Sequence, residues 1–152
     1  MIRELRRILL VEDDPRDVEL TMEALGENNL MNAVDVVGDG EKALEYLRRA
    51  GEFGKRSGEN PAVILLDLKL PKVDGKEVLK AIRADENLKM IPVVVLTSSR
   101  EERDLVESYR LGVNAYVVKP VDFHEFVDAV KNLGLFWAVI NEPPPGGAGK
   151  SS

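Results

Sequence analysis

Residues 63–71 of the chain read VILLDLKLP, a run of apolar residues that stops abruptly at one carboxylate, Asp67. A short, wholly apolar run of this kind is typical of a buried strand in a parallel sheet. Because an unpaired charge is costly to bury, Asp67 is expected at the exposed carboxyl end of that strand. Ligands of open parallel sheets bind outside these strand ends, so Asp67 becomes the first candidate for a functional site.

Three further apolar runs end on polar residues in the same way. The residues that follow them are Glu12, Asp13 and Asp14 after 8–11, Thr97 after 93–96, and Lys119 with Pro120 after 116–118. Because parallel strands bring their carboxyl ends to one edge of the sheet, these acids, the hydroxyl and the ammonium group are expected to converge with Asp67.

Apolar runs alternate five times with segments of helical period, which predicts an α/β fold with a doubly wound, five-stranded parallel sheet and five helices. Residues 51–61 are predicted to form a long polar loop. Capping signals mark four helix starts, at Asp14-Pro15, at Asp74-Gly75, at Ser99 with Glu102, and at Asp122 with Glu125.

The composition favours one globular domain in a reducing compartment. The 152 residues are 44% hydrophobic, include no cysteine and carry a net charge of −6, with basic residues spread along the chain. Nucleic acid is therefore not expected as a direct partner. Since no apolar run is long enough to span a bilayer and no signal peptide is evident, we expect a cytoplasmic protein without membrane contact. Residues 141–152 have little to bury and are expected to form a disordered Pro/Gly-rich tail.

Three carboxylates at one edge, from Glu12, Asp13 and Asp67, repel one another unless a positive charge neutralises them. Mg²⁺ fits best, because it prefers oxygen ligands, keeps several waters and is usually held by one or two carboxylates together with a phosphoryl group. A carboxylate beside such a metal can attack phosphorus, and Asp67 is the acid that ends the central strand. Taken singly, each acid is equally well explained as a helix cap or a solvated loop residue.

Lys119 and Thr97 supply the other groups that phosphoryl transfer requires, since the transferred oxygens need neutralisation and hydrogen bonding. Pro120 forces a turn after Lys119, through a cis or a trans bond, and is expected to aim the lysine back over the sheet edge. The alternatives are an ordinary strand threonine and a surface lysine.

Together these residues resemble the receiver domains of two-component response regulators, over about residues 6–140. The resemblance implies a flavodoxin-like strand order 2-1-3-4-5, a receiver domain at residues 1–140, and phosphorylation of Asp67 by a histidine kinase. Such a protein is a signalling protein, not an enzyme, since it catalyses only its own phosphorylation and dephosphorylation. The implied roles are metal binding for Glu12, Asp13, Asp67 and the main-chain oxygen of Lys69, switching for Thr97 and Tyr116, and pairing with the phosphoryl group for Lys119.

Residues 133–140 read LGLFWAVI and are apolar around every side of a helix. Exposed apolar patches with aromatic residues suggest an interface, so we expect a homodimer that uses Phe136 and Trp137. Alternatively, the loop at 51–61 or the tail folds over this surface. The Phe136-Trp137 ending, the long loop and the lack of an output domain resemble the small response regulators paired with phytochrome-type histidine kinases. The output is then a contact with a downstream protein that the sequence does not identify.

Two other functions are compatible with parts of this pattern. A Mg²⁺-dependent small-molecule phosphatase or phosphotransferase also places a nucleophilic aspartate at a strand end, but it usually has a second carboxylate two residues later, where this chain has Lys69. A degenerate receiver domain binds partners without phosphorylation, but here the acids, Thr97 and Lys119 are all present. The single His124 is expected to be a surface residue.

Overall fold

The computed structural model describes residues 7–26, 34–56, 60–98 and 111–132. Its five strands form one parallel sheet in the order β2-β1-β3-β4-β5, which confirms the predicted topology. The strands are β1 (Ile8–Val11), β2 (Val34–Val37), β3 (Val63–Asp67), β4 (Val93–Thr97) and β5 (Ala115–Val118).

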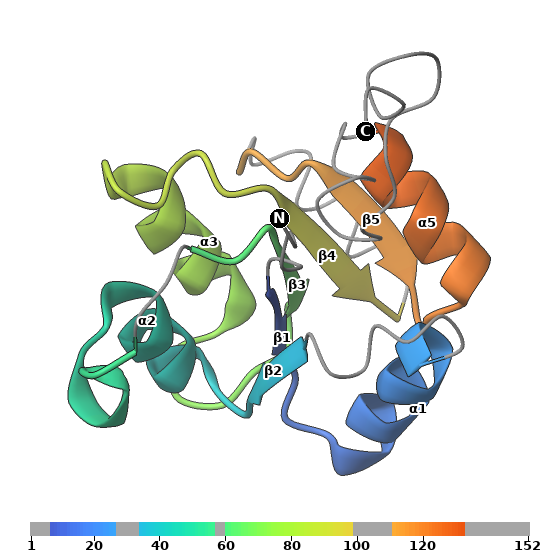
Figure 1. The fold of residues 1–152 in the computed structure, drawn as a ribbon, viewed down its shortest axis with the longest axis horizontal. Helices are drawn as coiled ribbons and strands as arrows, with labels where there is room; N and C mark the ends of the chain where they lie inside the picture. The colour runs from blue at the N-terminus through green and yellow to red at the C-terminus, as the bar shows by residue number, and fades with distance from the viewer. Residues whose placement is uncertain (1–6, 27–33, 57–59, 99–110, 133–152) are drawn as a thin grey trace, which may run out of the picture.

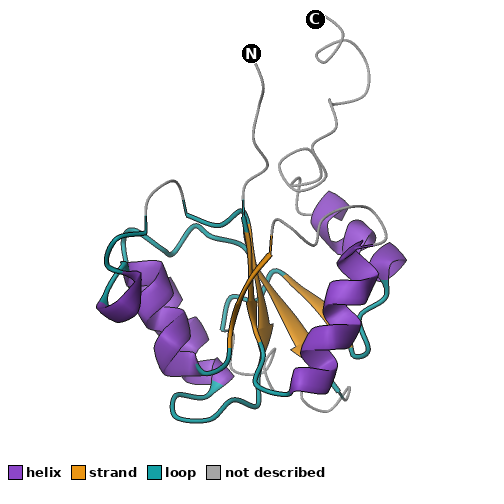
Figure 2. Ribbon diagram, turned by 60° about the horizontal axis from the view of Figure 1, so that its bottom comes forward, coloured by secondary structure: helices purple, strands orange, loops and turns teal. Residues whose placement is uncertain are grey.

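Four α-helices lie within the described residues and cover both faces of the sheet. They are α1 (Pro15–Gly26), α2 (Gly40–Arg48), α3 (Gly75–Ala84) and α5 (Phe123–Asn132). Helices α2 and α3 pack on one face, and α1 and α5 on the other (Figure 1). The helix predicted to begin at Ser99 lies outside the described residues. Figure 2 shows the strands between the two helical layers, with their arrowheads at one edge.

Aspartate side chains cap the described helices by accepting hydrogen bonds from first-turn N–H groups, at 2.7–3.2 Å. The caps at Asp14, Asp74 and Asp122 agree with the sequence prediction. A fourth cap, Asp39, begins α2 and accepts from the N–H of Lys42 at 2.7 Å. These caps fix where each helix begins relative to the strand before it, and so fix the loops that surround the carboxyl edge of the sheet.

The core consists of two apolar layers that divide alternate residues of each strand between them. In β1, Ile8 and Leu10 pack with residues of α1 and α5, whereas Leu9 and Val11 pack with residues of α2 and α3. All four are fully buried. Because successive strand residues face opposite sides, the same alternation determines which side each polar residue at a strand end faces.

The segment after α2 is more ordered than a polar loop. A short 3-10 helix occupies Gly51–Phe53, and the Phe53 ring meets the ring of Tyr46 edge-on, at 5.3 Å between centroids. The Arg56 guanidinium lies 4.1 Å from the centroid of the same Tyr46 ring. The prediction of a loop missed this structure because both ring contacts join the segment to Tyr46 of α2, which lies outside it.

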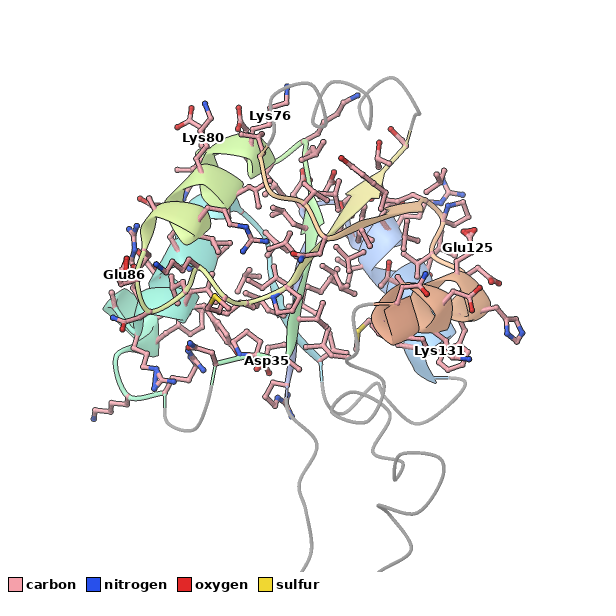
Figure 3. All side chains as sticks on the ribbon, turned by 90° about the horizontal axis from the view of Figure 1, so that it is seen from above. Asp35, Lys76, Lys80, Glu86, Glu125 and Lys131 are labelled. Atoms are coloured by element: carbon pink, nitrogen blue, oxygen red, sulfur yellow. The ribbon has the colours of Figure 1, made fainter. Side chains whose placement is uncertain are left out.

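Charged residues cover the outer surfaces of the helices. Figure 3 shows Lys76 and Lys80 on α3, and Glu125 and Lys131 on α5, all pointing away from the sheet. Among the described residues, no helix combines the length and apolar character that crossing a membrane requires.

Candidate metal centre at the carboxyl ends of the strands

Three acids meet where the neighbouring strands β1 and β3 end. Carboxylate oxygens of Glu12, Asp13 and Asp67 all lie within 4.8 Å of one another. Glu12 and Asp67 are buried, with 1% and 5% of their surface exposed, whereas Asp13 is exposed. Carboxylate oxygens are hard ligands, and the open side at Asp13 leaves room for water, so this donor set fits a hard divalent cation.

Lys119 reaches across the sheet edge into this acid cluster. Its Nζ lies 3.2 Å from Glu12 Oε1, 3.2 Å from Asp67 Oδ2 and 2.9 Å from Asp17 Oδ2. The backbone N–H of Lys119 donates to the Thr97 carbonyl at 2.8 Å, and the following bond to Pro120 is cis. The structure thus places Lys119 where the sequence predicted, beside Asp67.

Asp17 is the member of the site that the sequence analysis missed. It lies in the first turn of α1, four residues before Thr21 and eight before Leu25, which are both buried against the sheet. Residues at this spacing share one helix face, so Asp17 begins the buried stripe of α1 at the end nearest the acids. The sequence signal for Asp17 was an acidic residue at the start of a helix face whose later residues are buried.

Burial and crowding change the proton affinities of two groups. Burial raises the pKa of Glu12 to about 7, and the hydrogen bond and charge repulsion with Asp67 act in the same direction. The positive charge of Lys119 opposes this increase. Burial alone would lower the pKa of Lys119, but the hydrogen bond with Asp17 and the charges of Asp67 and Glu12 outweigh it and hold that pKa above its usual value. The cluster therefore keeps its cation charged and has one acid that is protonated near neutral pH.

Thr97 ends β4 and Tyr116 lies in β5, on the two strands beyond the one that ends at Asp67. Tyr116 packs against the apolar layer of α2 and α3 and is paired in register with Val95 of that layer. By strand alternation Thr97 shares the side of Val95, and it is fully buried at the end of β4, next to β3. The predicted switch residues thus share one layer, and Thr97 lies on the strand next to the one that ends at Asp67.

A pocket of about 610 Å³ opens beside the acids. Its walls include Asp13 and the loop between β3 and α3, in which the N–H of Lys69 donates to Asp67 Oδ1 at 3.1 Å. Lys69 therefore lies next to the acid cluster, as a metal-binding role for its main-chain oxygen requires. The predicted interface residues Phe136 and Trp137 lie outside the described residues.

Residues 8–131 match the family described as the response regulator receiver domain. The chain belongs to this family. The receiver domain is 64% identical to the bacteriophytochrome response regulator RtBRR, over 94% of this chain and 86% of that one, with a TM-score of 0.84. It is also 41% identical to the response regulator Rcp1 of Synechocystis sp., over 86% of this chain and 87% of that protein.

A solved structure of Rcp1 is described as its Mn²⁺-bound form. That structure is 38% identical to this receiver domain and covers 93% of this chain and 99% of its own, with a TM-score of 0.69. Receiver domains bind divalent metals, and the cluster of Glu12, Asp13 and Asp67 provides the acids for such a site. The family and the carboxylate geometry therefore agree on a divalent metal centre.

Metal affinity is expected to fall as the pH decreases through 7. The pKa of Glu12 is raised from 4.5 to about 7 in the metal-free fold. Protonated Glu12 therefore favours the folded state below the pKa of the unfolded chain, and this contribution to stability is lost as the pH rises through 7. A metal requires the ionised form, so it must displace a proton at low pH. Titration calorimetry should show affinity about tenfold weaker near pH 6 than near pH 8.

The control for this pH dependence is Glu12→Gln, which cannot ionise. Its metal affinity should be weaker throughout but should change much less between the two pH values. An equally steep pH dependence in Glu12→Gln would show that another group competes with the metal.

Proposed function

We propose that this receiver domain takes a phosphoryl group from a histidine kinase onto Asp67, in a Mg²⁺-dependent reaction. A carboxylate oxygen of Asp67 forms the bond to phosphorus, the P–N bond of the kinase phosphohistidine breaks, and the imidazole leaves with the electron pair. The observation that carries the proposal is the convergence of Glu12, Asp13 and Asp67, with Lys119 Nζ 3.2 Å from Asp67 Oδ2.

Each residue around Asp67 has a defined part in this proposal. Glu12, Asp13, Asp67 and the main-chain oxygen of Lys69 would hold Mg²⁺, which would supply positive charge to the transferred phosphoryl group. Lys119, whose Nζ lies 3.2 Å from Asp67 Oδ2, supplies a second positive charge. The chain then acts on no other substrate and catalyses only its own phosphorylation and dephosphorylation.

Thr97 and Tyr116 carry the signal away from Asp67 in this proposal. A phosphoryl dianion on Asp67 attracts the Thr97 hydroxyl, and its movement makes room for Tyr116, which is half-buried in the same layer. The phosphoryl group shifts the population only because it interacts better with the rearranged state. A full change from off to on requires about 5.5 kcal/mol of differential interaction.

The relatives support a proposal for the phosphodonor of this receiver domain. Because two bacteriophytochrome or phytochrome-associated response regulators are similar over most of their length, we infer a phytochrome-type histidine kinase as phosphodonor. In this proposal residues 1–140 are the receiver domain, residues 141–152 are a tail, and the output is a contact with a downstream protein. This contact takes place in the cytoplasm, where the kinase domain would meet the receiver.

A homodimer through residues 133–140 is part of the same proposal. Trp137→Ala and Phe136→Ala are each expected to shift sedimentation toward the monomer, because both remove aromatic surface from an apolar segment. Unchanged association in both variants would exclude this segment as the dimer interface.

Incubation with Mg²⁺ and acetyl phosphate tests the phosphorylation directly. Intact mass spectrometry should show a gain of one phosphoryl group in the wild type, and no gain in Asp67→Asn or when EDTA removes the metal. Asn keeps the shape of the side chain but lacks the nucleophilic oxygen. Phosphorylation of Asp67→Asn at the wild-type rate would contradict the proposal, and turnover of diverse phosphoesters would favour a phosphatase.

A further inference from the structure

The ion pair between Asp17 and Lys119 has no part in the reaction as proposed. Asp17 Oδ2 lies 2.9 Å from Lys119 Nζ, closer than the oxygens of Glu12 and Asp67, which lie at 3.2 Å. The Asp17 side chain is 26% exposed and that of Lys119 is 14% exposed. A pair this close and this shielded interacts more strongly than two charges on an open surface.

Lys119 already uses its full hydrogen-bonding capacity in this arrangement. An ammonium group has three N–H donors, and the three contacts of Lys119 go to Glu12, Asp17 and Asp67. The Lys119 N–H that donates to Asp67 can instead donate to a phosphoryl oxygen, while the other two N–H groups still donate to Glu12 and Asp17. Asp17 therefore holds the lysine from the side of α1 and offsets part of its positive charge.

We propose that Asp17 is a positioning residue that restrains phosphorylation, because its carboxylate competes with the phosphoryl group for Lys119. This inference rests on Asp67 being the phosphoacceptor. The acids of the metal cluster lie where a cation can offset their charge, whereas Asp17 lies outside that cluster and is paired with Lys119.

Asp17→Asn separates charge from position, since the amide keeps an oxygen that accepts from Lys119 but carries no charge. With saturating Mg²⁺ and acetyl phosphate, an Asp67 oxygen bonds to phosphorus, the P–O bond to acetate breaks, and acetate leaves. We expect this reaction to be about fivefold faster in Asp17→Asn than in the wild type, measured as a time course of intact mass. Asp17→Ser, which also keeps an uncharged oxygen, should change the rate in the same direction.

The matched control is Glu19→Gln, which removes the same charge from the same helix. Glu19 is exposed, and within the described part of the chain it makes no ion pair with Lys119. Its phosphorylation rate should stay within about twofold of the wild type. Asp17→Glu restores the charge and is expected to return the rate toward that of the wild type.

A double-mutant cycle tests whether Asp17 acts through Lys119. In a Lys119→Met background, Asp17→Asn should give no acceleration, and an acceleration that persists there would overturn the inference. An Asp17→Asn rate equal to or below that of the wild type, or matched by Glu19→Gln, would overturn it as well. A wild-type protein that is not phosphorylated at all would instead refute the proposed function, so the two failures are distinct.

Discussion

Lys119→Met is expected to lower the free energy of unfolding by about 3 kcal/mol at pH 8 without metal. Lys119 lies within 3.2 Å of the carboxylates of Glu12 and Asp67, which are buried, and methionine fills a similar volume without the charge. Removing one partner of a buried ion pair leaves the other charges uncompensated, which costs far more than losing a surface pair. Urea unfolding monitored by circular dichroism measures the difference.

The dependence of this stability loss on pH and on metal tests whether the uncompensated acids cause it. Near pH 5 the loss should shrink, because the acids can then take up protons, and added Mg²⁺ should recover part of it. Phosphorylation by acetyl phosphate should be slower by about 10²-fold, as when one preorganised charge or hydrogen-bond donor is removed from a reacting group.

Lys80→Met is the matched control for this variant. Lys80 lies on α3 and points away from the sheet (Figure 3), so the substitution removes the same charge far from the acids. It should leave the stability within about 0.5 kcal/mol and the phosphorylation rate unchanged. A Lys119→Met protein as stable as Lys80→Met at pH 8 would show that the lysine does not neutralise the acid cluster.

Gly40→Ala is expected to destabilise the fold by about 3 kcal/mol. A Cβ at position 40 would lie 1.8 Å from the carbonyl oxygen of Val73 and 2.7 Å from its carbonyl carbon. Both are backbone atoms of the loop between Asp67 and α3, so they cannot rotate away. Because this loop carries Lys69, its displacement should also weaken metal binding. Urea unfolding and metal titration measure the two effects.

Gly38→Ala, two residues away, is the control. A Cβ at position 38 would meet no described atom within 4 Å. The free energy of unfolding of Gly38→Ala should therefore stay within about 0.5 kcal/mol of the wild type. Equal stability of the two variants would mean that the loop after Asp67 does not pack against the start of α2 as described.

The strands and most of the site could be predicted because their signals are local, whereas the strand order was implied by the resemblance to receiver domains. An apolar run that ends on Asp67 or Glu12 identifies both a buried strand and the acid at its carboxyl end, and parallel pairing brings such ends together. The two acids are themselves buried there, and not exposed as expected for Asp67. Helix starts at Asp14 and Asp74 are equally local, since each depends on one side chain and the N–H groups of the next turn.

The features that were missed depend on contacts between distant elements. Asp17 could not be predicted as part of the site in this way, because its contact with Lys119 joins α1 to the end of β5. The close approach of Gly40 to Val73 joins segments more than thirty residues apart, and no periodic pattern encodes it. The same holds for Asp35 of β2, which accepts from the Tyr46 hydroxyl and from the Arg7 guanidinium.

Chemical mapping of the phosphorylated residue distinguishes Asp67 from the other acids of the site. Borohydride reduces an aspartyl phosphate to homoserine, so reduction of the phosphorylated protein followed by peptide mass spectrometry locates the modified position. If Asp67 is the phosphoacceptor, homoserine appears at position 67, and it is absent when Mg²⁺ is omitted. Modification of Asp13 or Glu12 instead, or phosphate carried by His124, would contradict this assignment.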